Sequence, residues 1–263
     1  MDILKRSLAP ITEKAWEEID DLAKQVITTQ LSGRRFVDVE GPKGVAHACE
    51  PLGRLDVPTD QPAGEPNYGV HQCMPLLEVR MPFELDIWEL DNVERGAKDV
   101  DLDALEEACK KMAHFEEKAI FEGFEKAGIE GLKKVAKDPL PCGKEGQEFL
   151  ATITKALSRF KESGIEGPFT LVVNPALWEK IAINYKGYPL KKHIKDLTGG
   201  DVLFTHATDC GLLVSSRGGD MKLIIGQDYA IGYHSHTSDK IRLFLTLSFT
   251  FRVLEPKAII GLS

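Results

Sequence analysis

Two closely spaced histidines, His234 and His236, are the residues whose type and spacing come nearest to a metal chelate. Side chains two positions apart in a strand point to the same face, so both rings would be presented to one ion. A structural or catalytic metal site needs further ligands, and no third ligand stands out in the sequence. We therefore predict an ordinary turn between strands at this segment and no metal site.

The cysteines do not complete a metal site either. The chain has five of them: Cys49, Cys73, Cys109, Cys142 and Cys210. Their number is odd, no two form a C-x-x-C pair, and the spacing of a zinc site is absent. This pattern favours reduced thiols in the cytoplasm over a framework of disulfides.

Signatures of common catalytic sites are absent from the sequence. We find no G-x-S-x-G, H-E-x-x-H, phosphate-binding or dinucleotide-binding motif. The formal net charge is -8 and the Lys and Arg residues are dispersed, so there is no basic stripe for a nucleic-acid backbone. No run of eighteen apolar residues and no secretion signal is visible. The sequence therefore predicts neither an enzyme nor a protein that binds nucleic acid or membranes.

Long elements dominate the beginning and the end of the chain. Residues 12–31 predict a helix, because Thr12 suits an N-cap and apolar residues recur every three or four positions. Residues 102–127 predict a second helix, about 39 Å long. Residues 76–90 and 240–253 alternate apolar and polar side chains, which predicts strands with one buried and one solvent-facing side. Such long, thin elements bury little of their surface in a monomer, which indicates an oligomer.

Shorter elements and a long loop fill the rest of the chain. The run 35–39 predicts a short strand. Residues 51–75 hold five prolines and three glycines, which predicts a long irregular or extended loop. Residues 136–214 predict a compact α/β subdomain, with a helix at 147–162 and a strand at 169–173. Within it, the dipeptide Asn174-Pro175 predicts the N-cap and first residue of a helix.

Six segments of the chain together carry a family pattern. They are 4–10 (LKRSLAP), 33–42 (GRRFVDVEGP), 85–92 (LDIWELDN), 164–168 (GIEGP), 216–220 (SRGGD) and 226–233 (GQDYAIGY). In this order they resemble the encapsulin shell proteins, a family also called linocin-like. Each segment alone is weakly specific, but six in register along the chain are a strong signal.

The resemblance implies an α+β chain with the HK97-like phage capsid fold, which has a peripheral domain, an axial domain and an extended loop. The expected parts are the N-terminal helix and arm (1–50), the extended loop (51–75), the peripheral domain with its spine helix (76–135), the axial domain (136–214), and the return to the peripheral domain with a C-terminal strand (215–263). The extended loop would pair with a neighbouring subunit, and the axial domain would meet its copies at a symmetry axis.

The resemblance also implies a function. Encapsulin shells are icosahedral homo-oligomers in the cytoplasm that enclose a cargo enzyme carrying a C-terminal targeting peptide. Typical cargos are ferritin-like proteins, linked to iron storage, and dye-decolorizing peroxidases, linked to oxidative stress. The expected partners are therefore further copies of the chain and a cargo enzyme, and no cofactor is required.

Two alternatives stay open at this point. A phage-type major capsid protein shares the fold, but the chain starts at once with the encapsulin-type helix, without a cleavable scaffold segment. Its net charge also gives no support for an inner wall that faces packed DNA. Bacteriocin or protease activity has been attached to relatives, but no nucleophile and base with suitable spacing support it here.

The family's cargo peptide docks between the N-terminal helix and a segment of the peripheral domain. An extended peptide with apolar anchors needs a shallow apolar groove and a few orienting charges. Alternatively, the apolar residues among the matching positions simply pack the helix onto the sheet. The matching positions are Ile27, Leu31, Arg34, Asp38, Tyr229, Ile231 and Gly232.

Two other positions carry expectations from the resemblance. Trp88 is predicted on the polar face of its strand beside Arg80, where a large ring needs to be covered. We favour a subunit interface there, with a flavin stacked on Trp88 near Arg80 as the second hypothesis. The turn formed by Lys186, Gly187, Tyr188 and Pro189 would lie in an axial loop that lines a pore, although glycine and proline also suit any turn.

Overall fold

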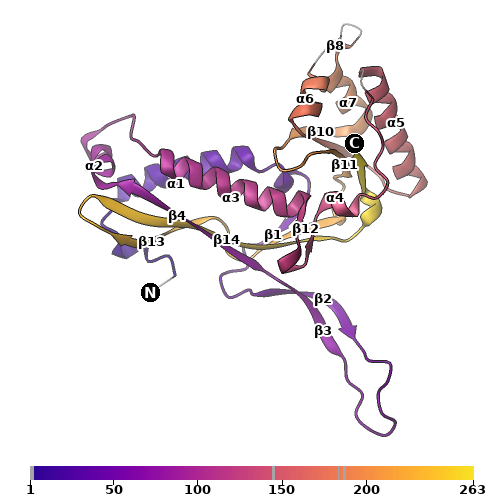
Figure 1. Cartoon of the computed structure of the whole chain (residues 1–263), viewed down its shortest axis with the longest axis horizontal. Helices are drawn as coiled ribbons and strands as arrows, with labels where there is room; N and C mark the ends of the chain where they lie inside the picture. The colour runs from indigo at the N-terminus through magenta and orange to yellow at the C-terminus, as the bar shows by residue number, and fades with distance from the viewer. Residues whose placement is uncertain (1–2, 144–145, 183, 186–187) are drawn as a thin grey trace.

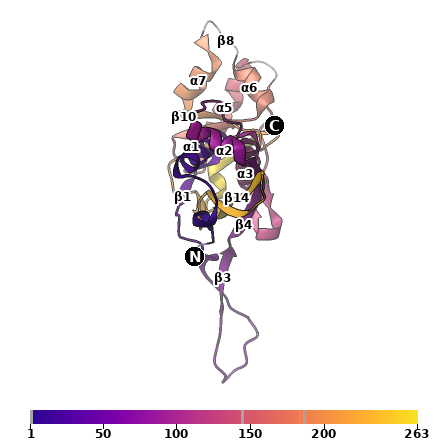
Figure 2. The same cartoon turned by 90° about the vertical axis from the view of Figure 1, so that its left-hand side faces the viewer.

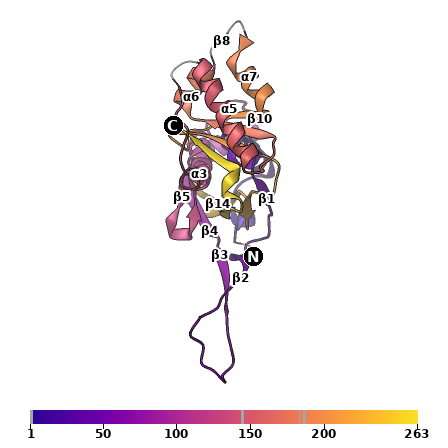
Figure 3. The ribbon, with the colours of Figure 1, turned by 90° about the vertical axis from the view of Figure 1, so that its right-hand side faces the viewer.

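A computed structural model of the protein describes residues 3–143, 146–182, 184–185 and 188–263. It contains a first lobe around a five-stranded sheet, a second lobe around a four-stranded sheet, and a two-stranded arm (Figure 1). Side views show the arm and the second lobe pointing away from opposite sides of the first lobe (Figure 2, Figure 3). The protein is therefore an elongated α+β molecule, and the predicted fold class is confirmed.

The sheet of the first lobe is centred on β14 (Lys240–Val253). One edge of β14 pairs with β4 (Leu77–Asp86). The other edge pairs with β13 (Ala230–His236) and then with β12 (Met221–Ile225), and β12 pairs in parallel with β1 (Asp38–Glu40). The sheet thus joins strands from both ends of the chain.

The alternation of buried and exposed side chains is confirmed in β4, where Phe83 and Leu85 are buried and Glu84 is exposed. The prediction of a solvent-facing side for 240–253 is wrong, because every residue from 243 to 251 is buried. β14 has strands along both edges, and its second face carries small hydroxyl side chains that the neighbouring strands cover. Thr246 donates to the carbonyl of Val79 at 3.1 Å.

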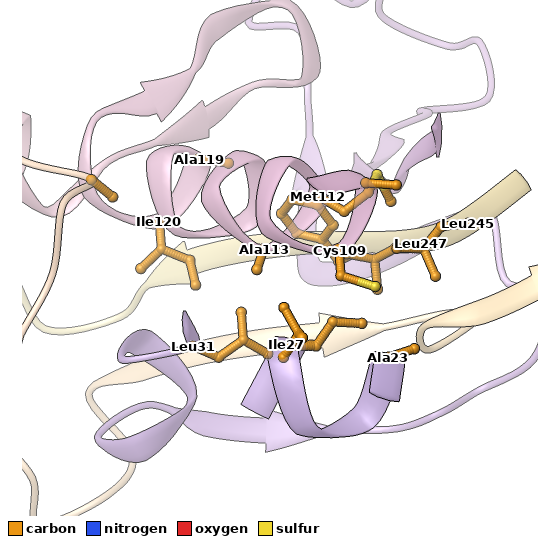
Figure 4. Packing of buried hydrophobic residues seen from close by; sticks show 14 of the residues in the cluster. Ala23, Ile27, Leu31, Cys109, Met112, Ala113, Ala119, Ile120, Leu245 and Leu247 are labelled. Carbon is orange, nitrogen blue, oxygen red and sulfur yellow. The ribbon is translucent and has the colours of Figure 1, made fainter. Parts of the chain in front are cut away.

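Helix α1 (Glu13–Gln30) confirms the predicted helix at 12–31. The Oγ1 of Thr12 accepts the N–H of Ala15 at 3.2 Å, which is the expected N-cap contact. The apolar stripe of α1 packs against the long helix α3 (Asp103–Phe121) and the sheet (Figure 4). This layer is the main core of the first lobe.

Helix α3 (Asp103–Phe121) is shorter than the predicted helix at 102–127. Gly123 has a φ of +93°, outside helical geometry, and a Cβ there would lie 2.7 Å from the backbone nitrogen of Gly131. This close approach joins the short strands β5 (Gly123–Phe124) and β6 (Ile129–Glu130). A non-local backbone contact therefore ends the helix before its favourable sequence does.

Helix α2 (Ile87–Arg95) occupies the end of the segment that we predicted as a strand. The Oδ1 of Asp86 accepts the N–H of Trp88 at 2.9 Å, so Asp86 ends β4 and caps α2. We predicted a strand up to residue 90 because apolar and polar side chains alternate along most of this segment. The side-chain cap at Asp86 nevertheless favours a helix over a longer strand.

The sheet of the second lobe has the order β10 (Gly199–Phe204), β7 (Phe169–Val173), β11 (Gly211–Ser215) and β15 (Ile259–Leu262). Its helices are α5 (Gly146–Glu162), α6 (Pro175–Ile181) and α7 (Leu190–Thr198). The structure confirms α5, β7 and the N-cap, since the Oδ1 of Asn174 accepts the N–H of Leu177 at 2.9 Å. The C-terminal strand β15 lies in this sheet rather than beside β14.

The remaining elements are short. The predicted strand at 35–39 is wrong in its first half, where a 3-10 turn replaces it. The short elements are the 3-10 turns Arg6–Leu8, Gly33–Arg35, Glu125–Ala127 and Pro256–Ala258, the helix α4 (Leu132–Val135), and the paired strands β8 (Asn184–Tyr185) and β9 (Tyr188–Pro189).

The arm is the hairpin of β2 (Cys49–Asp56) and β3 (Val70–Pro75), which replaces the predicted loop at 51–75. It projects away from the first lobe (Figure 1). Apolar side chains on it are more than half exposed, namely Leu55, Val57, Tyr68 and Val70. Isolated two-stranded hairpins are marginally stable in water, so the arm is a surface that another chain is expected to cover.

A buried carboxylate links the two lobes. Glu117 on α3 accepts hydrogen bonds from the hydroxyl of Ser32, the N–H of Gly33 (2.7 Å) and the hydroxyl of Thr205 in the second lobe (3.1 Å). Burial raises the pKa of Glu117, the hydrogen bonds from Ser32 and Gly33 lower it, and the nearby charge of Glu116 raises it. The net direction is upward, so the folded protein binds a proton here more readily than the unfolded chain does.

We expect the substitution Glu117→Gln to flatten the dependence of stability on pH. A raised pKa stabilises the folded state below the ordinary glutamate pKa, about 4.3, and this contribution is lost as pH rises through the folded pKa. In that window one such group changes the free energy of unfolding by at most about 1.4 kcal/mol per pH unit. Urea denaturation between about pH 5 and pH 8 measures this slope.

The matched control is Glu107→Gln, which removes an exposed carboxylate from the same helix. It should leave the pH slope as it is in the parent protein. An unchanged slope in Glu117→Gln would show that Glu117 does not titrate in this range.

Candidate functional site

An open groove of about 830 Å³ lies between α1 and the segment 228–231 that leads into β13. It is larger than two other hollows in the described residues, which have volumes of about 120 and 590 Å³. Five of the seven predicted cargo-binding residues line it, and they come from two parts of the chain about two hundred residues apart. These five are Ile27, Leu31, Arg34, Tyr229 and Ile231.

The other two predicted residues lie outside the groove. Asp38 is on β1, where its Oδ2 accepts the N–H of Gly219 at 2.6 Å. Gly232 is next to Ile231 on β13 and therefore faces the opposite side of the sheet, against the ring of Phe244. Both residues therefore make structural contacts and do not line this groove.

The apolar floor of the groove is also part of the core. Ile27 and Leu31 are each only 7% exposed, and Figure 4 shows them pointing from α1 toward α3. Ile231 is 2% exposed. The packing role considered for these residues is therefore confirmed, and only their edges are offered to a ligand.

Arg34 is fixed in the wall by two carboxylates. Its Nε and Nη2 donate to Glu116 at 2.7 and 2.8 Å, and its Nη1 and Nη2 donate to Asp228 at 3.2 and 3.0 Å. Burial lowers the pKa of Arg34, but the bonds and charges of Glu116 and Asp228 outweigh it and hold the pKa above the ordinary value. The charge of Arg34 is therefore already balanced inside the protein.

Tyr229 completes this wall. The guanidinium of Arg34 lies 5.1 Å from its ring centroid, within the range of a cation–π contact. Burial raises the pKa of Tyr229, so its hydroxyl stays protonated at neutral pH. The wall thus presents an aromatic edge beside the aliphatic floor.

The rim of the groove contains charged residues that the sequence analysis missed. Arg6 is paired with Asp20 through contacts of 3.0 and 2.7 Å, whereas Lys24 and Arg35 are exposed. Asp20, Lys24 and Thr28 recur every four residues beside the apolar stripe of α1, so helical spacing offered a signal for them. The groove combines an apolar floor with exposed cations, which suits an extended peptide carrying apolar and acidic side chains.

The arrangement on which the flavin hypothesis rested is absent. Trp88 lies on α2 and not on the polar face of a strand, because Asp86 caps that helix. The guanidinium of Arg95 lies 5.5 Å from the Trp88 ring, and Arg80 instead contacts Glu78 and the ring of Phe244. Trp88 is 64% exposed, so it is available for the subunit interface that we favoured.

The strand β8, which comes just before the predicted pore turn in the chain, lies at the far end of the second lobe (Figure 1). Lys186 and Gly187 lie outside the described residues. Tyr188 and Pro189 form β9, which pairs with β8.

The two histidines lie in a strand and not in a turn, so that prediction is wrong. The ring of His236 contacts the hydroxyl of Tyr233 at 2.6 Å, and that of His234 contacts the hydroxyl of Ser235 at 3.0 Å. Within the described ranges, no three His, Cys, Asp or Glu side chains are placed to hold a metal ion. In the same ranges, no helix is long and apolar enough to cross a membrane.

Comparisons with known proteins agree with this architecture. A family model described as "Encapsulating protein for peroxidase" (Linocin_M18) matches residues 1–250. The type 1 encapsulin shell proteins of Mycolicibacterium paratuberculosis and Mycobacterium tuberculosis are each 37% identical over the full length of both chains. The chain belongs to this encapsulin family. The corresponding protein of Brevibacterium linens is 33% identical over the full length of both chains.

Solved structures show the same fold at lower sequence identity. A virus-like particle from Pyrococcus furiosus has a TM-score of 0.70 at 18% identity, covering 94% of this chain and 99% of that one. The capsid of Myoviridae phage XM1 has a TM-score of 0.58 at 12% identity, covering 88% and 91%. The encapsulin chain therefore has the HK97-like phage capsid fold. Its match to the encapsulin family makes it a structural shell protein.

Proposed function

We propose that this encapsulin assembles with copies of itself into a closed icosahedral shell in the cytoplasm and encloses a cargo enzyme. The groove between α1 and β13 carries this proposal, because it offers one docking site for a peptide on every subunit. The exposed apolar arm supports self-assembly, since a neighbouring copy would cover it. This role requires no cofactor.

The proposed ligand of the groove is the C-terminal targeting peptide of the cargo. Its apolar side chains would lie on Ile27, Leu31 and Ile231, and its acidic groups would face Lys24 and Arg35. The family description names a peroxidase, so a dye-decolorizing peroxidase is the first cargo to test and a ferritin-like protein the second. The turn at 186–189 would line the pore through which small molecules enter.

The alternatives have less support. The likeness to phage capsids concerns the fold alone, and bacteriocin or protease activity would need a catalytic site that the sequence motifs do not indicate. Digestion of casein by a cargo-free preparation of the protein would support the protease alternative. DNA that is protected from nuclease inside purified particles would favour a capsid.

Electron microscopy of the chain expressed alone tests the shell. We expect uniform hollow icosahedral particles. Monomers or small oligomers at every salt concentration and pH would contradict self-assembly.

Substitution Thr28→Trp tests the groove separately from the shell. Thr28 is exposed on the groove side of α1, so an indole there would occupy the space that the peptide needs. Co-expressed with a fluorescent protein fused to the last thirty or so residues of the peroxidase from the same genome, the variant should form normal shells with at least about tenfold less fluorescence per shell.

The control is Gln25→Trp, on the same helix, exposed and outside the groove. It should load cargo as the parent shell does. Equal loading of Thr28→Trp and the parent would exclude this groove as the docking site while leaving the shell proposal intact.

A further inference from the structure

Two cysteines lie on one face at the base of the arm. In the hairpin, Cys49 faces Pro75 and Cys73 faces Pro51. Residues two apart in a strand share a face, so all four side chains point the same way and the cysteines are diagonal neighbours. Both cysteines are exposed, whereas Cys109 is buried and the other two are half-buried.

The register places the two thiols within reach of each other. Diagonal pairs in a hairpin have Cα atoms about 7–8 Å apart on average, and twist shortens one diagonal of each rung pair. The interaction with Cys73 is the largest cause of the raised pKa of Cys49, which agrees with the two thiols lying on the shorter diagonal. A disulfide needs a Cα separation of up to about 6.8 Å, so only a small approach of the strands is required.

The backbone ladder is weak at this point. Proline has no N–H, so Pro51 and Pro75 each remove one possible donor from the two rungs on which the cysteines lie. The register is irregular from Pro51 to Leu55. A disulfide here would therefore join two strands that are connected by few backbone hydrogen bonds.

We propose that Cys49 and Cys73 are a redox modification site, where a peroxide converts the dithiol into an intramolecular disulfide that closes the base of the arm. The link joins residues of one chain across its own hairpin. In the reduced state the base of the arm opens more readily, and in the oxidised state it is held shut.

The reaction balances with one peroxide per pair. The interaction with Cys73 raises the pKa of Cys49, so we assign the first attack to the sulfur of Cys73. This sulfur attacks hydrogen peroxide, the O–O bond breaks, and a sulfenic acid and water form. The sulfur of Cys49 then attacks the sulfenic sulfur, the S–S bond forms, and a second water leaves. Two thiols are oxidised and one peroxide is reduced to two waters.

Peptide mass spectrometry of the full-length protein tests the link directly. Arg54 is the one Lys or Arg between the two cysteines, so trypsin releases Cys49 in the peptide 44–54 and Cys73 in the peptide 55–80. After treatment with hydrogen peroxide and alkylation of the remaining thiols, we expect these peptides to be joined, with the loss of two hydrogens. Dithiothreitol should separate them.

The arm itself provides the second readout. In the oxidised protein, amide hydrogen exchange in 50–56 and 70–75 should slow by at least about threefold relative to the reduced protein. The variant Cys49→Ser should show neither the joined peptides nor the slower exchange. The control Cys210→Ser, which removes a half-buried cysteine of the second lobe, should show both.

Three outcomes would overturn the proposal. The first is separate alkylation of both cysteines after peroxide treatment. The second is a link between two chains, seen as a dimer on a non-reducing gel. The third is unchanged exchange in a protein whose joined peptides show the disulfide to be complete, which would remove its effect on the arm.

Discussion

Replacing Arg34 by methionine should destabilise the protein by about 3–5 kcal/mol, because it leaves the buried carboxylate of Glu116 without its partner. The Glu116 side chain is fully buried and accepts two hydrogen bonds from this guanidinium. Methionine fills a similar length but donates nothing. The shift of the urea denaturation midpoint at fixed protein concentration measures the loss.

Cargo loading should fall in the same variant. Arg34 also holds Asp228 and lies against the ring of Tyr229, so its removal loosens one wall of the groove. We expect the fluorescence of co-expressed cargo per shell to drop together with stability.

The neighbouring residue supplies a matched control. Arg35→Met removes a side chain that is 60% exposed and has a single ion pair at 3.8 Å, so its effect on stability should stay within about 0.5 kcal/mol. The double variant Arg34→Met, Glu116→Met should recover part of the loss, because no unpaired buried charge remains. A single Arg34→Met variant as stable as Arg35→Met would show that water or another group solvates Glu116.

The double substitution Leu55→Asp, Val57→Asp should abolish shell assembly and leave the subunit folded. Both side chains are more than half exposed, and both lie against Gly69 on one face of the arm. A neighbouring copy that covers this face would have to bury two unpaired carboxylates, which costs several kcal/mol at each of the many interfaces of a shell. Size-exclusion chromatography and electron microscopy should show small oligomers only.

Circular dichroism separates this result from misfolding, since neither side chain is part of a core. The control Thr59→Asp, Asn67→Asp adds the same charge at exposed polar positions near the tip of the arm and should still assemble. Normal shells from the apolar-to-Asp variant would mean that the arm does not carry the contact between copies.

Elements with a local cause could be predicted from the sequence alone. Helix α1 and its cap at Thr12, helix α5, strand β7 and the cap at Asn174 follow from periodicity and from side chains that bond to the backbone a few residues away. The length of β14 was also predictable, because its alternation runs without interruption. The family was identified from six short segments, since their order along the chain needs no three-dimensional information.

Predictions from local sequence patterns were wrong where contacts with other segments determine the structure. Helix α3 ends early because Gly123 meets the backbone of Gly131, and the second face of β14 is buried because strands from elsewhere flank it. At Trp88 two local signals competed, and the cap at Asp86 outweighed the alternation that we followed.

The candidate site could not be predicted from local sequence, because its residues are brought together by the fold. The groove joins residues of α1 to a segment about two hundred positions later, and Arg34 is balanced by carboxylates 82 and 194 residues away. The same folding placed Gly232 on the opposite face from Ile231 and brought Cys49 against Cys73 across the hairpin. Such contacts depend on strand register and on how helices pack on a sheet, and neither is determined by the residues next to them in the chain.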